Sequence, residues 1–317
     1  MVGSDGTEGA SAYGGDGWQP RDTSLREELG TVWGHCGATD EFSALKGVIL
    51  HRPGDELAAS SDPRAAQMLE PLDLSKAQAE HDAMAEAYRN AGVAVHYVDP
   101  PGTPQPNQMF CADLMWMTPE GAVLARPASS VRAGEERQVA RRLADLGVPI
   151  LMTPSGSATF EGADAMWLDP RTVVLGLGLR TNHAMAEQLA VLLARMNINL
   201  IPVDLPYGTM HLMGMLRIAG PDIAVAWYRR TPHRVVAELK ARGYRVVFLP
   251  DEPGRTLNKA INFVTLASDK ILMPAGYPQV QAFYEEHGIE CICVSVDELT
   301  KAAGAIGCLT GVMWRSE

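Results

Sequence analysis

Short apolar stretches alternate with mixed polar and apolar stretches from about residue 45 onward. The apolar run at residues 46–51 predicts a strand, and the proline and glycine that follow it predict a turn. Residues 74–90 predict a helix that ends just before a glycine. A further strand is predicted at residues 93–98. This alternation of strands and helices indicates an α/β protein.

The N-terminal part of the chain lacks such a pattern. Residues 1–38 are rich in glycine, serine, aspartate and alanine, with no sustained apolar period. We therefore expect a flexible tail over residues 1–38. The remaining residues, 39–317, are numerous enough for one large domain.

The chain repeats itself with a period of about fifty residues. Residues 112–119 (Ala-Asp-Leu-Met-Trp-Met-Thr-Pro) and residues 163–170 (Ala-Asp-Ala-Met-Trp-Leu-Asp-Pro) share five of eight positions at an offset of 51. Each copy predicts a strand, a proline-bearing turn and a second strand, followed by a helix and a short strand. Two weaker copies span residues 211–249 and 260–296. A fifth copy is split between residues 307–314 and the segment near residue 46.

Five units of this kind, arranged in a ring, would form a five-bladed α/β propeller of ββαβ repeats. Repeats of this length are typical of arrays in which each unit buries its apolar face on its neighbours. The alternative is an ordinary α/β sheet with accidental internal similarity. In a ring the strand ends converge on a central pit, so functional residues should recur at intervals of about one repeat.

Residues with catalytic chemistry recur at such intervals. Glu161 and His211 are 50 residues apart, and Cys308 follows His211 by 97 residues, close to two repeats; Asp113 and Asp164 occupy matching places in two copies. A thiol reacts as its thiolate, which a neighbouring imidazole promotes. A carboxylate beside that imidazole fixes its tautomer. The spacing therefore predicts a cysteine-dependent site with Cys308 as nucleophile and His211 as its acid/base partner.

Other interpretations of these residues remain open at this stage. A single cysteine is commonly a small buried hydrophobe, and a single histidine or aspartate commonly packs or caps a turn. Cys111 is the rival nucleophile. Its neighbour Asp113 would raise the pKa of the Cys111 thiol, so Cys308 is preferred.

The composition limits the class of partner. The formal net charge of -11 argues against nucleic acid and suits a small cationic substrate. No apolar run is long enough for a membrane helix, and the N-terminus has no secretory signal pattern. Five cysteines without a regular framework argue against a disulfide scaffold and a metal site. We therefore expect a cytoplasmic protein with reduced thiols.

Five short motifs resemble the guanidino-group-modifying superfamily, the penteins. This superfamily includes arginine deiminases, dimethylarginine dimethylaminohydrolases, arginine dihydrolases and amidinotransferases. The motifs follow one another in the order and spacing of the superfamily, within a resemblance that covers roughly residues 41–314. They lie at residues 107–113, 160–164, 180–182, 210–212 and 307–310. The resemblance implies one catalytic domain over residues 39–317 with the five-bladed α/β propeller fold, in agreement with the repeat.

The resemblance also implies a reaction. Cys308 would attack the guanidino carbon of arginine or an N-substituted arginine, and His211, oriented by Glu161, would be the general acid/base. A covalent thiouronium on Cys308 would then be hydrolysed to a product such as citrulline. No metal or organic cofactor is implied.

Four further residues are implied to bind the substrate. Asp113 resembles the carboxylate that holds the guanidinium group, with Asp164 assisting it. Arg132 and Arg180 resemble the two arginines that grip the substrate carboxylate, a task for which planar guanidinium groups are well suited.

Three positions depart from the superfamily pattern. Met213 stands where arginine deiminases have aspartate, Ala112 stands where an arginine precedes the first aspartate, and Ala163 replaces a glycine. These departures favour a substituted guanidine, or a substrate other than plain arginine.

The sequence leaves several activities open. An amidinotransferase would pass the amidino group to an amine instead of water, and a dihydrolase would continue to ornithine. A non-catalytic propeller that only binds is the alternative of another class. The expected partner is a small guanidino compound, and a homodimer is the default expectation for the assembly.

Overall fold

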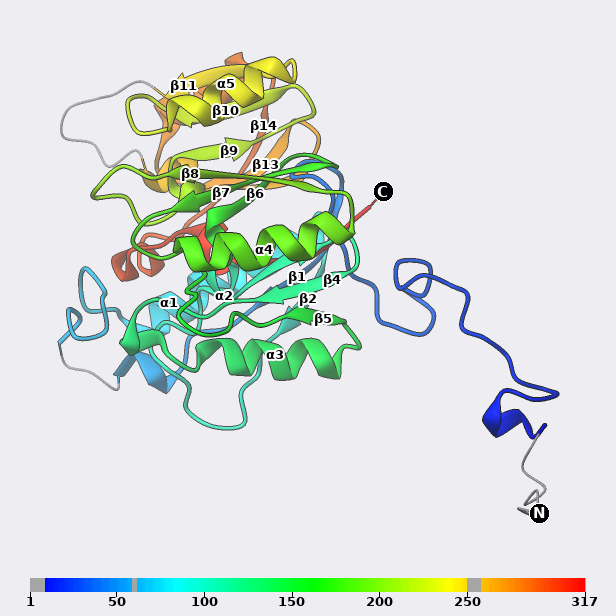
Figure 1. Cartoon of the computed structure of the whole chain (residues 1–317). Coiled ribbons are helices and arrows are strands. Elements are labelled where there is room, and N and C mark those ends of the chain that lie inside the picture. The colour runs from blue at the N-terminus through cyan, green and yellow to red at the C-terminus, as the bar shows by residue number, and fades with distance from the viewer. Residues whose placement is uncertain (1–8, 59–61, 250–257, 317) are drawn as a thin grey trace, which may run out of the picture.

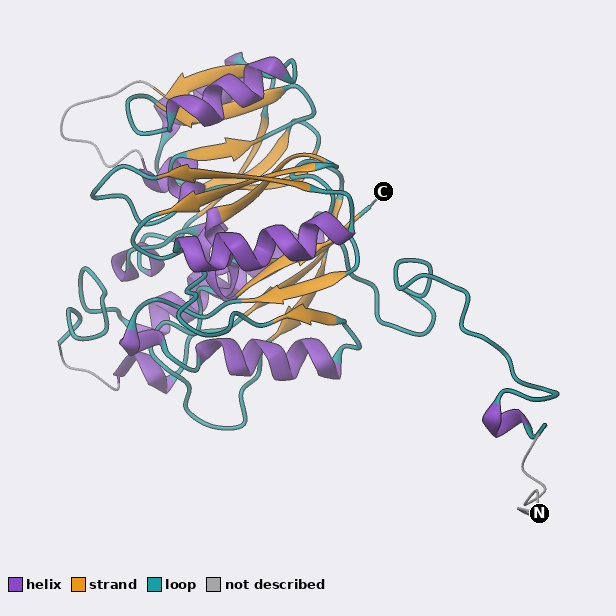
Figure 2. Cartoon of the chain, in the orientation of Figure 1, coloured by secondary structure: helices purple, strands orange, loops and turns teal. Residues whose placement is uncertain are grey.

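The protein contains five small mixed sheets with helices beside them (Figures 1 and 2). The structure, a computed structural model, describes residues 9–58, 62–249 and 258–316. Each sheet within these ranges has three strands. The predicted α/β class is therefore confirmed.

All five sheets share one topology. In each, the first strand pairs antiparallel with the second, and the second pairs parallel with the third. The first strands are β3 (Met115–Thr118), β6 (Ala165–Asp169), β9 (Leu216–Ile218), β12 (Val264–Ala267) and β15 (Gly311–Arg315). The second strands are β4 (Gly121–Leu124), β7 (Thr172–Leu177), β10 (Ile223–Trp227), β13 (Lys270–Pro274) and β1 (Leu45–Leu50). The third strands are β5 (Ile150–Met152), β8 (Asn199–Asp204), β11 (Arg245–Leu249), β14 (Glu290–Val294) and β2 (Ala94–Tyr97).

A helix connects the second strand of each sheet to the third, as the ββαβ repeat predicted. These helices are α3 (Glu135–Asp145), α4 (His183–Arg195), α5 (His233–Ala241), α7 (Pro278–Glu286) and α1 (Leu74–Asn90). Helix α1 has the predicted bounds. The side chain of Asp73 accepts a hydrogen bond from the Lys76 N–H at its start, which satisfies one of the free N–H groups of the first turn. Ala77, Met84 and Tyr88 lie on its buried face.

The two ends of the domain meet in one sheet. Strand β15 pairs with β1, with Val312 opposite Val48, although the two strands lie far apart in the sequence. The predicted split of the fifth unit is thus confirmed.

Five hydrophobic clusters of buried residues lie between the sheets, and each cluster contains side chains from two of them. Between the β3 and β6 sheets, Trp116 stacks on Trp167 with ring centroids 5.1 Å apart. These two tryptophans occupy the same position in the repeat. The internal similarity of the sequence therefore reflects equivalent packing in successive units.

A short helical turn precedes the first strand of each sheet. These turns are α2 (Cys111–Leu114), α6 (Asn258–Ile261), α8 (Ile306–Leu309) and the 3-10 helices η4 (Gly162–Asp164) and η5 (Leu212–Gly214). The sequence predicted strands beginning at residues 112, 163, 211, 260 and 307, which is wrong by three to five residues in four cases and by two in the other. The backbone there closes local bonds instead, such as Asp164 N–H to the Glu161 carbonyl at 3.0 Å.

The N-terminal segment extends away from the sheets in Figure 1. The chain bonds to the body from Gly34 onward, where the Gly34 N–H donates to the Gly147 carbonyl at 2.8 Å, and His35 stacks on Trp314 with centroids 4.7 Å apart. Residues 1–8 lie outside the described ranges, and the division at residue 38 stays a prediction. No helix among the described residues is long and apolar enough to cross a membrane.

Candidate active site

The short turns bring five polar side chains together at equivalent places in the repeat. Turn α2 contacts α8 and η4, η4 contacts η5, and η5 contacts α6. The five residues lie in these turns or directly beside them: Asp113, Glu161, His211, Asn262 and Cys308. Because each turn ends where a first strand begins, the repeat itself positions the side chains.

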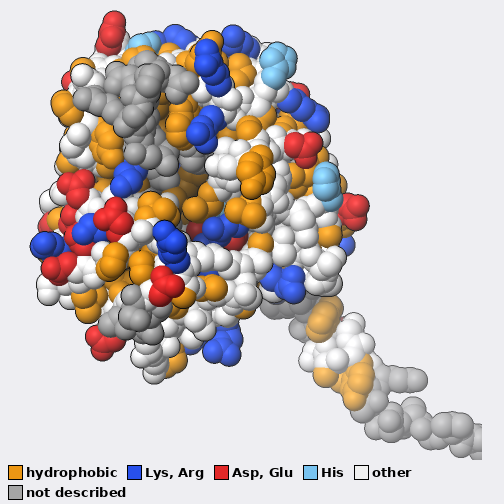
Figure 3. Space-filling view, turned by 90° about the vertical axis from the view of Figure 1, so that its left-hand side faces the viewer, with side chains coloured by type: hydrophobic (Ala, Val, Ile, Leu, Met, Phe, Trp, Pro, Cys, Tyr) orange, Lys and Arg blue, Asp and Glu red, His pale blue; other side chains and the backbone are white. Residues whose placement is uncertain are grey.

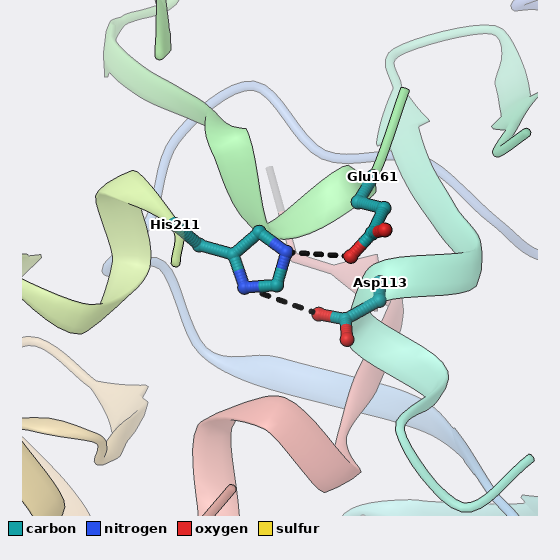
Figure 4. A group of neighbouring side chains, drawn as sticks. All are labelled: Asp113, Glu161 and His211. Atoms are coloured by element: carbon teal, nitrogen blue, oxygen red, sulfur yellow. Dashed lines mark hydrogen bonds and ion pairs between the residues drawn. The ribbon is translucent and has the colours of Figure 1, made fainter. Parts of the chain in front are cut away.

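A buried imidazole lies between two carboxylates (Figure 4). His211 Nε2 lies 2.7 Å from Glu161 Oε2, and His211 Nδ1 lies 3.8 Å from Asp113 Oδ1. All three residues are buried. The first contact is a short hydrogen bond, so Glu161 fixes the orientation of the ring.

These carboxylates make His211 basic. Burial alone would lower the pKa of His211, but Asp113, the hydrogen bond to Glu161, and Asp164 outweigh it and raise the pKa to about 9. Burial would conversely raise the pKa of Glu161, yet the hydrogen bond and charge of His211 hold it below its ordinary value. The pair is therefore an imidazolium and a carboxylate at neutral pH, and the imidazolium can give a proton to a departing amine.

Both predicted arginines lie at this site, where they pair with acidic side chains. Arg132 Nη1 donates to Asp113 Oδ2 at 2.6 Å and Arg132 Nε donates to Glu135 Oε2 at 2.8 Å. Arg180 Nη1 lies 3.0 Å from both oxygens of Glu161. Glu135 was not predicted. It is fully buried, and its place three residues after Arg132 at the start of α3 is the signal that the sequence offered.

Three atoms of this network keep unused hydrogen-bonding capacity in the described part of the chain, and one of them is Glu135 Oε1. Asp113 Oδ1 and Arg132 Nη2 are buried and have no hydrogen-bond partner in the described part of the chain. Both residues line a small compartment that also contains Arg180 and Cys308. Buried polar atoms without partners are rare in proteins, so the compartment suits a ligand that donates to Asp113 and accepts from Arg132.

Asp164 lies in the same region but holds the protein backbone. Its Oδ2 accepts from Thr181 Oγ1 at 2.7 Å, and its Oδ1 accepts from the Leu212 N–H at 3.0 Å. Burial raises the pKa of Asp164 to about 6. Because Leu212 follows His211, Asp164 fixes the turn that carries the imidazole.

Cys308 is hydrogen-bonded to Asn262, which was not predicted as a site residue. Asn262 Nδ2 donates to Cys308 Sγ at 2.9 Å, and Asn262 Oδ1 accepts from the Cys308 N–H at 3.0 Å. The glycine before the cysteine permits this approach, because a Cβ on Gly307 would lie 2.6 Å from Asn262 Oδ1. Asn262 follows His211 by 51 residues, one repeat, which is the signal that could have found it.

The Cys308 thiol is held in its protonated form. Burial and the charge of Asp113 raise its pKa to about 11, although the hydrogen bond from Asn262 acts in the opposite direction. Cys111, the rival nucleophile, is fully buried, and its Sγ contacts the Gln108 carbonyl at 3.8 Å. Burial and Asp113 raise the pKa of Cys111 further than that of Cys308.

Cys308 connects two hollows. It lines the small compartment with Asp113 and Arg132, and it also lines a cavity of about 340 Å³ with His211 and Asn262. A group bound at Cys308 therefore has room on two sides.

The acidic cluster has ligand atoms close enough for a metal ion. One atom from each of Asp113, Glu161 and His211 lies within 4.8 Å of the others. The positive charges of Arg132 and Arg180 already neutralise these carboxylates at 2.6 Å and 3.0 Å. A divalent cation would be repelled by those guanidinium groups, so the residues do not fit a metal.

Two solved enzyme structures have the same fold as this protein. The structure of dimethylarginine dimethylaminohydrolase from Pseudomonas aeruginosa, a cysteine-to-serine variant complexed with citrulline, matches with a TM-score of 0.71 at 22% identity, over 86% of this chain and 100% of that chain. An amidinotransferase of saxitoxin biosynthesis from Microseira wollei matches with a TM-score of 0.71 at 15% identity, over 89% and 98%. The protein therefore shares the fold of these two enzymes.

The sequence narrows this fold class to one family. Residues 62–314 match the family model for N,N-dimethylarginine dimethylhydrolase, eukaryotic. The human protein DDAH2 is 27% identical over 274 residues, covering 80% of this chain and 90% of that protein. The N(G),N(G)-dimethylarginine dimethylaminohydrolase of Streptomyces coelicolor is 25% identical, covering 84% and 96%. The chain belongs to the dimethylarginine dimethylhydrolase family, a family of amidine-hydrolysing enzymes.

Proposed function

We propose that this protein hydrolyses the guanidino group of arginine or of an N-substituted arginine, with release of an amine and a citrulline-type product. The observation that carries the proposal is the buried Asp113 Oδ1, which accepts no hydrogen bond from the described residues and belongs to a residue that lines a compartment together with Cys308. A guanidinium N–H is the donor that this oxygen lacks, and the cation would neutralise its charge. Held there, the guanidino carbon is presented to the thiol.

The proposed fold is a closed five-bladed propeller. Each of the five sheets shares one hydrophobic cluster with the unit on either side of it, and the β15–β1 sheet shares clusters with both the β3 sheet and the β12 sheet. Five units linked in this way return to their starting point. Closure would also explain why the five turns converge on one site.

In the first step the Cys308 thiolate attacks the guanidino carbon. The bond from that carbon to one nitrogen breaks, and His211 donates its proton to the departing amine. The electrons of the broken bond leave with the amine, and a positively charged thiouronium remains on Cys308. Glu161, at 2.7 Å from His211 Nε2, stabilises the imidazolium before the transfer.

In the second step the now neutral His211 takes a proton from a water molecule. The hydroxyl adds to the thiouronium carbon, and the bond from carbon to sulfur breaks with its electrons leaving on sulfur. The added hydroxyl releases its own proton to solvent, and the neutral ureido product leaves. The thiolate and the imidazolium are then regenerated. General acid/base assistance of this kind contributes about 10²- to 10⁴-fold in rate.

Binding of the cationic substrate would also activate the nucleophile. The charge of Asp113 raises the pKa of Cys308 in the free protein. A guanidinium group bound to Asp113 offsets that charge and places a positive charge beside the sulfur, which lowers the thiol pKa. The substrate would thus promote formation of the thiolate that attacks it.

The two arginines are proposed to bind the substrate carboxylate. Arg132 and Arg180 both line the small compartment, and Arg132 Nη2 has no hydrogen-bond partner among the described residues. Both guanidinium groups are already held by acidic side chains, so they would meet the substrate in fixed positions.

Product analysis tests the proposed function. We expect the protein to convert N-methylated arginines, and to a lesser extent arginine, to citrulline with release of the matching amine, as measured by mass spectrometry. An ornithine product would instead indicate a dihydrolase. Consumption of the guanidine only in the presence of an added amine would indicate an amidinotransferase. Binding without any consumption would support the non-catalytic alternative and contradict the proposal.

Asn262 is proposed to position the thiol and stabilise the thiolate through its 2.9 Å bond. Asn262→Ala removes this donor, and Asn262→Asp replaces it with a negative charge while keeping an oxygen for the Cys308 N–H. We expect the Cys308 pKa to rise in Asn262→Ala and to rise further in Asn262→Asp. Hydrogen bonds to charged groups contribute about 1.5–3 kcal/mol, so alkylation by iodoacetamide at fixed pH should slow by about 10- to 100-fold.

The graded order of the two variants is the decisive readout for Asn262. A merely structural role would lower the unfolding temperature without moving the pH profile of alkylation in that order. Asn199→Asp, at the exposed first residue of strand β8, is the matched control and should leave the profile unchanged.

A further inference from the structure

The cavity beside His211 is larger than a methylated guanidine requires. Its volume is about 340 Å³, more than twice that of an engineered cavity of about 150 Å³ that holds benzene, and within the range of ligand pockets of about 300–1,000 Å³. Figure 3 shows this face of the molecule, with a hollow that has hydrophobic side chains around it. A dimethylamine leaving group would leave most of this space empty.

We propose that this cavity binds the substituent on the departing nitrogen, and that the substrate is an arginine whose guanidino group carries an aliphatic chain longer than methyl that ends in an anionic group. This inference rests on the proposed hydrolysis and names its substrate class.

The position of His211 assigns the cavity to the leaving amine. His211 lines this cavity together with Cys308, whereas Arg132 and Arg180 line the small compartment, which Cys308 also lines. The acid that protonates the departing nitrogen must lie within reach of it. The amino-acid part of the substrate therefore lies toward the arginines, and the departing amine lies in the cavity.

The walls of the cavity are mainly apolar. Met213 and Met215 line it from η5 and the residue that follows, and Trp227 lines it from the end of β10. Leu69 and Met210 also line it, although their side chains are 62% and 37% exposed. Exposed apolar side chains grouped at a hollow are typical of a ligand site. Methionine side chains also adapt their shape to flexible aliphatic ligands.

Two cations give the cavity its charge. Arg230 and Lys259 line it. Arg230 lies over the ring of Trp227 at 4.4 Å from the centroid, and Lys259 Nζ donates to Thr300 Oγ1 at 2.7 Å. Neither forms an ion pair with an acidic side chain in the part of the chain that the structure describes. An anionic end on the substituent would supply the missing negative charge.

A series of Nω-substituted arginines tests the proposal on the intact protein. We expect kcat/KM to rise by about fourfold for each methylene added between methyl and pentyl, as expected for burial of a CH₂ group. A chain of the same length that ends in a carboxylate should gain on the order of tenfold more, a gain that salt weakens.

Two variants test whether the preferences for chain length and for a carboxylate arise in this cavity. A Cβ on Gly214, which lines the cavity, meets no atom within 4 Å, so Gly214→Leu should fill the cavity and reduce the pentyl-to-methyl ratio to about one. Gly102→Leu is the matched control, because Gly102 is exposed and a Cβ there is equally free. Arg230→Gln should remove most of the carboxylate preference, and Arg229→Gln, its exposed neighbour outside the cavity, should keep it.

The outcomes separate this inference from the proposed function. If methylarginine is hydrolysed but kcat/KM stays flat or falls as the substituent lengthens, the inference is overturned and the proposed hydrolysis stands. If no guanidine is turned over, calorimetry with the Cys308→Ser variant decides. Affinity that rises with chain length and is lost in Gly214→Leu would support the cavity as a substituent site. Affinity independent of chain length would overturn it.

Discussion

Replacing Cys308 by alanine is expected to abolish turnover of guanidino substrates, with kcat/KM lowered by on the order of 10⁴-fold or more. The mechanism requires a covalent bond from the guanidino carbon to Sγ, and among the described residues that line the compartment only Cys308 carries a thiol. The thiol is buried and makes one side-chain hydrogen bond, to Asn262, so its removal should change the unfolding temperature only slightly. Product formation and thermal unfolding, measured together, check both expectations.

Two other cysteines serve as controls for Cys308→Ala. Cys111→Ala removes the rival thiol, and Cys293→Ala removes an exposed one. Both variants should retain turnover, and the intact mass of the protein during turnover should show an adduct unless Cys308 is replaced. Normal turnover in Cys308→Ala, or its loss in Cys111→Ala with the fold intact, would contradict the assignment of the nucleophile.

Replacing His211 by glutamine is expected to lower kcat/KM for guanidines by about 10²- to 10⁴-fold. Glutamine can still donate a hydrogen bond to the Glu161 carboxylate, but it cannot give a proton to the departing amine. A substrate whose leaving group departs without a proton should therefore lose much less. Steady-state kinetics with an N-methylated arginine and with a thioether analogue of citrulline measure this difference.

The pH profile gives a second test of His211. The reactive form contains the Cys308 thiolate and the His211 imidazolium. The pKa of Cys308 is raised to about 11 and that of His211 to about 9. The population of the reactive form increases by about tenfold per pH unit, stops increasing above about pH 9 as His211 loses its proton, and decreases beyond about pH 11. We expect kcat/KM to bend near pH 9 in the natural protein and to rise without that bend in His211→Gln.

The exposed His233, at the start of α5, is the matched control. His233→Gln should leave both the rate and the bend unchanged. A bend near pH 9 that persists in His211→Gln would assign the titration to another group and would contradict the proposed acid.

The repeat in the sequence predicted much of the fold because equivalent residues make equivalent packing contacts in successive units. Trp116 and Trp167 match in the sequence and stack on each other in the structure. The spacing of Glu161, His211 and Cys308 likewise predicted a single site. In the structure Glu161 bonds to His211, and Cys308 lines the same cavity as His211. The catalytic roles of these residues stay predictions.

The partners of the site residues could not be predicted in the same way. Sequence patterns give the type of a residue but not which acidic group a long guanidinium side chain reaches, so the bonds of Arg132 to Asp113 and Glu135 were missed. Asn262 was in phase with the repeat, but an amide side chain does not indicate a reaction by itself. Its role depends on the turn at Gly307, where the backbone approaches closely enough for two bonds.

The pairing of β15 with β1 has a consequence for how the molecule comes into existence. Strand β1 is synthesised early, yet its antiparallel partner β15 emerges from the ribosome after every other strand. Contacts between residues so distant in the chain are slow to form, because a long loop must close first. Until then the β1–β2 edge has no antiparallel neighbour. The thiol at Cys308, only a few residues before β15, would therefore reach its site in the same late event that completes the first sheet.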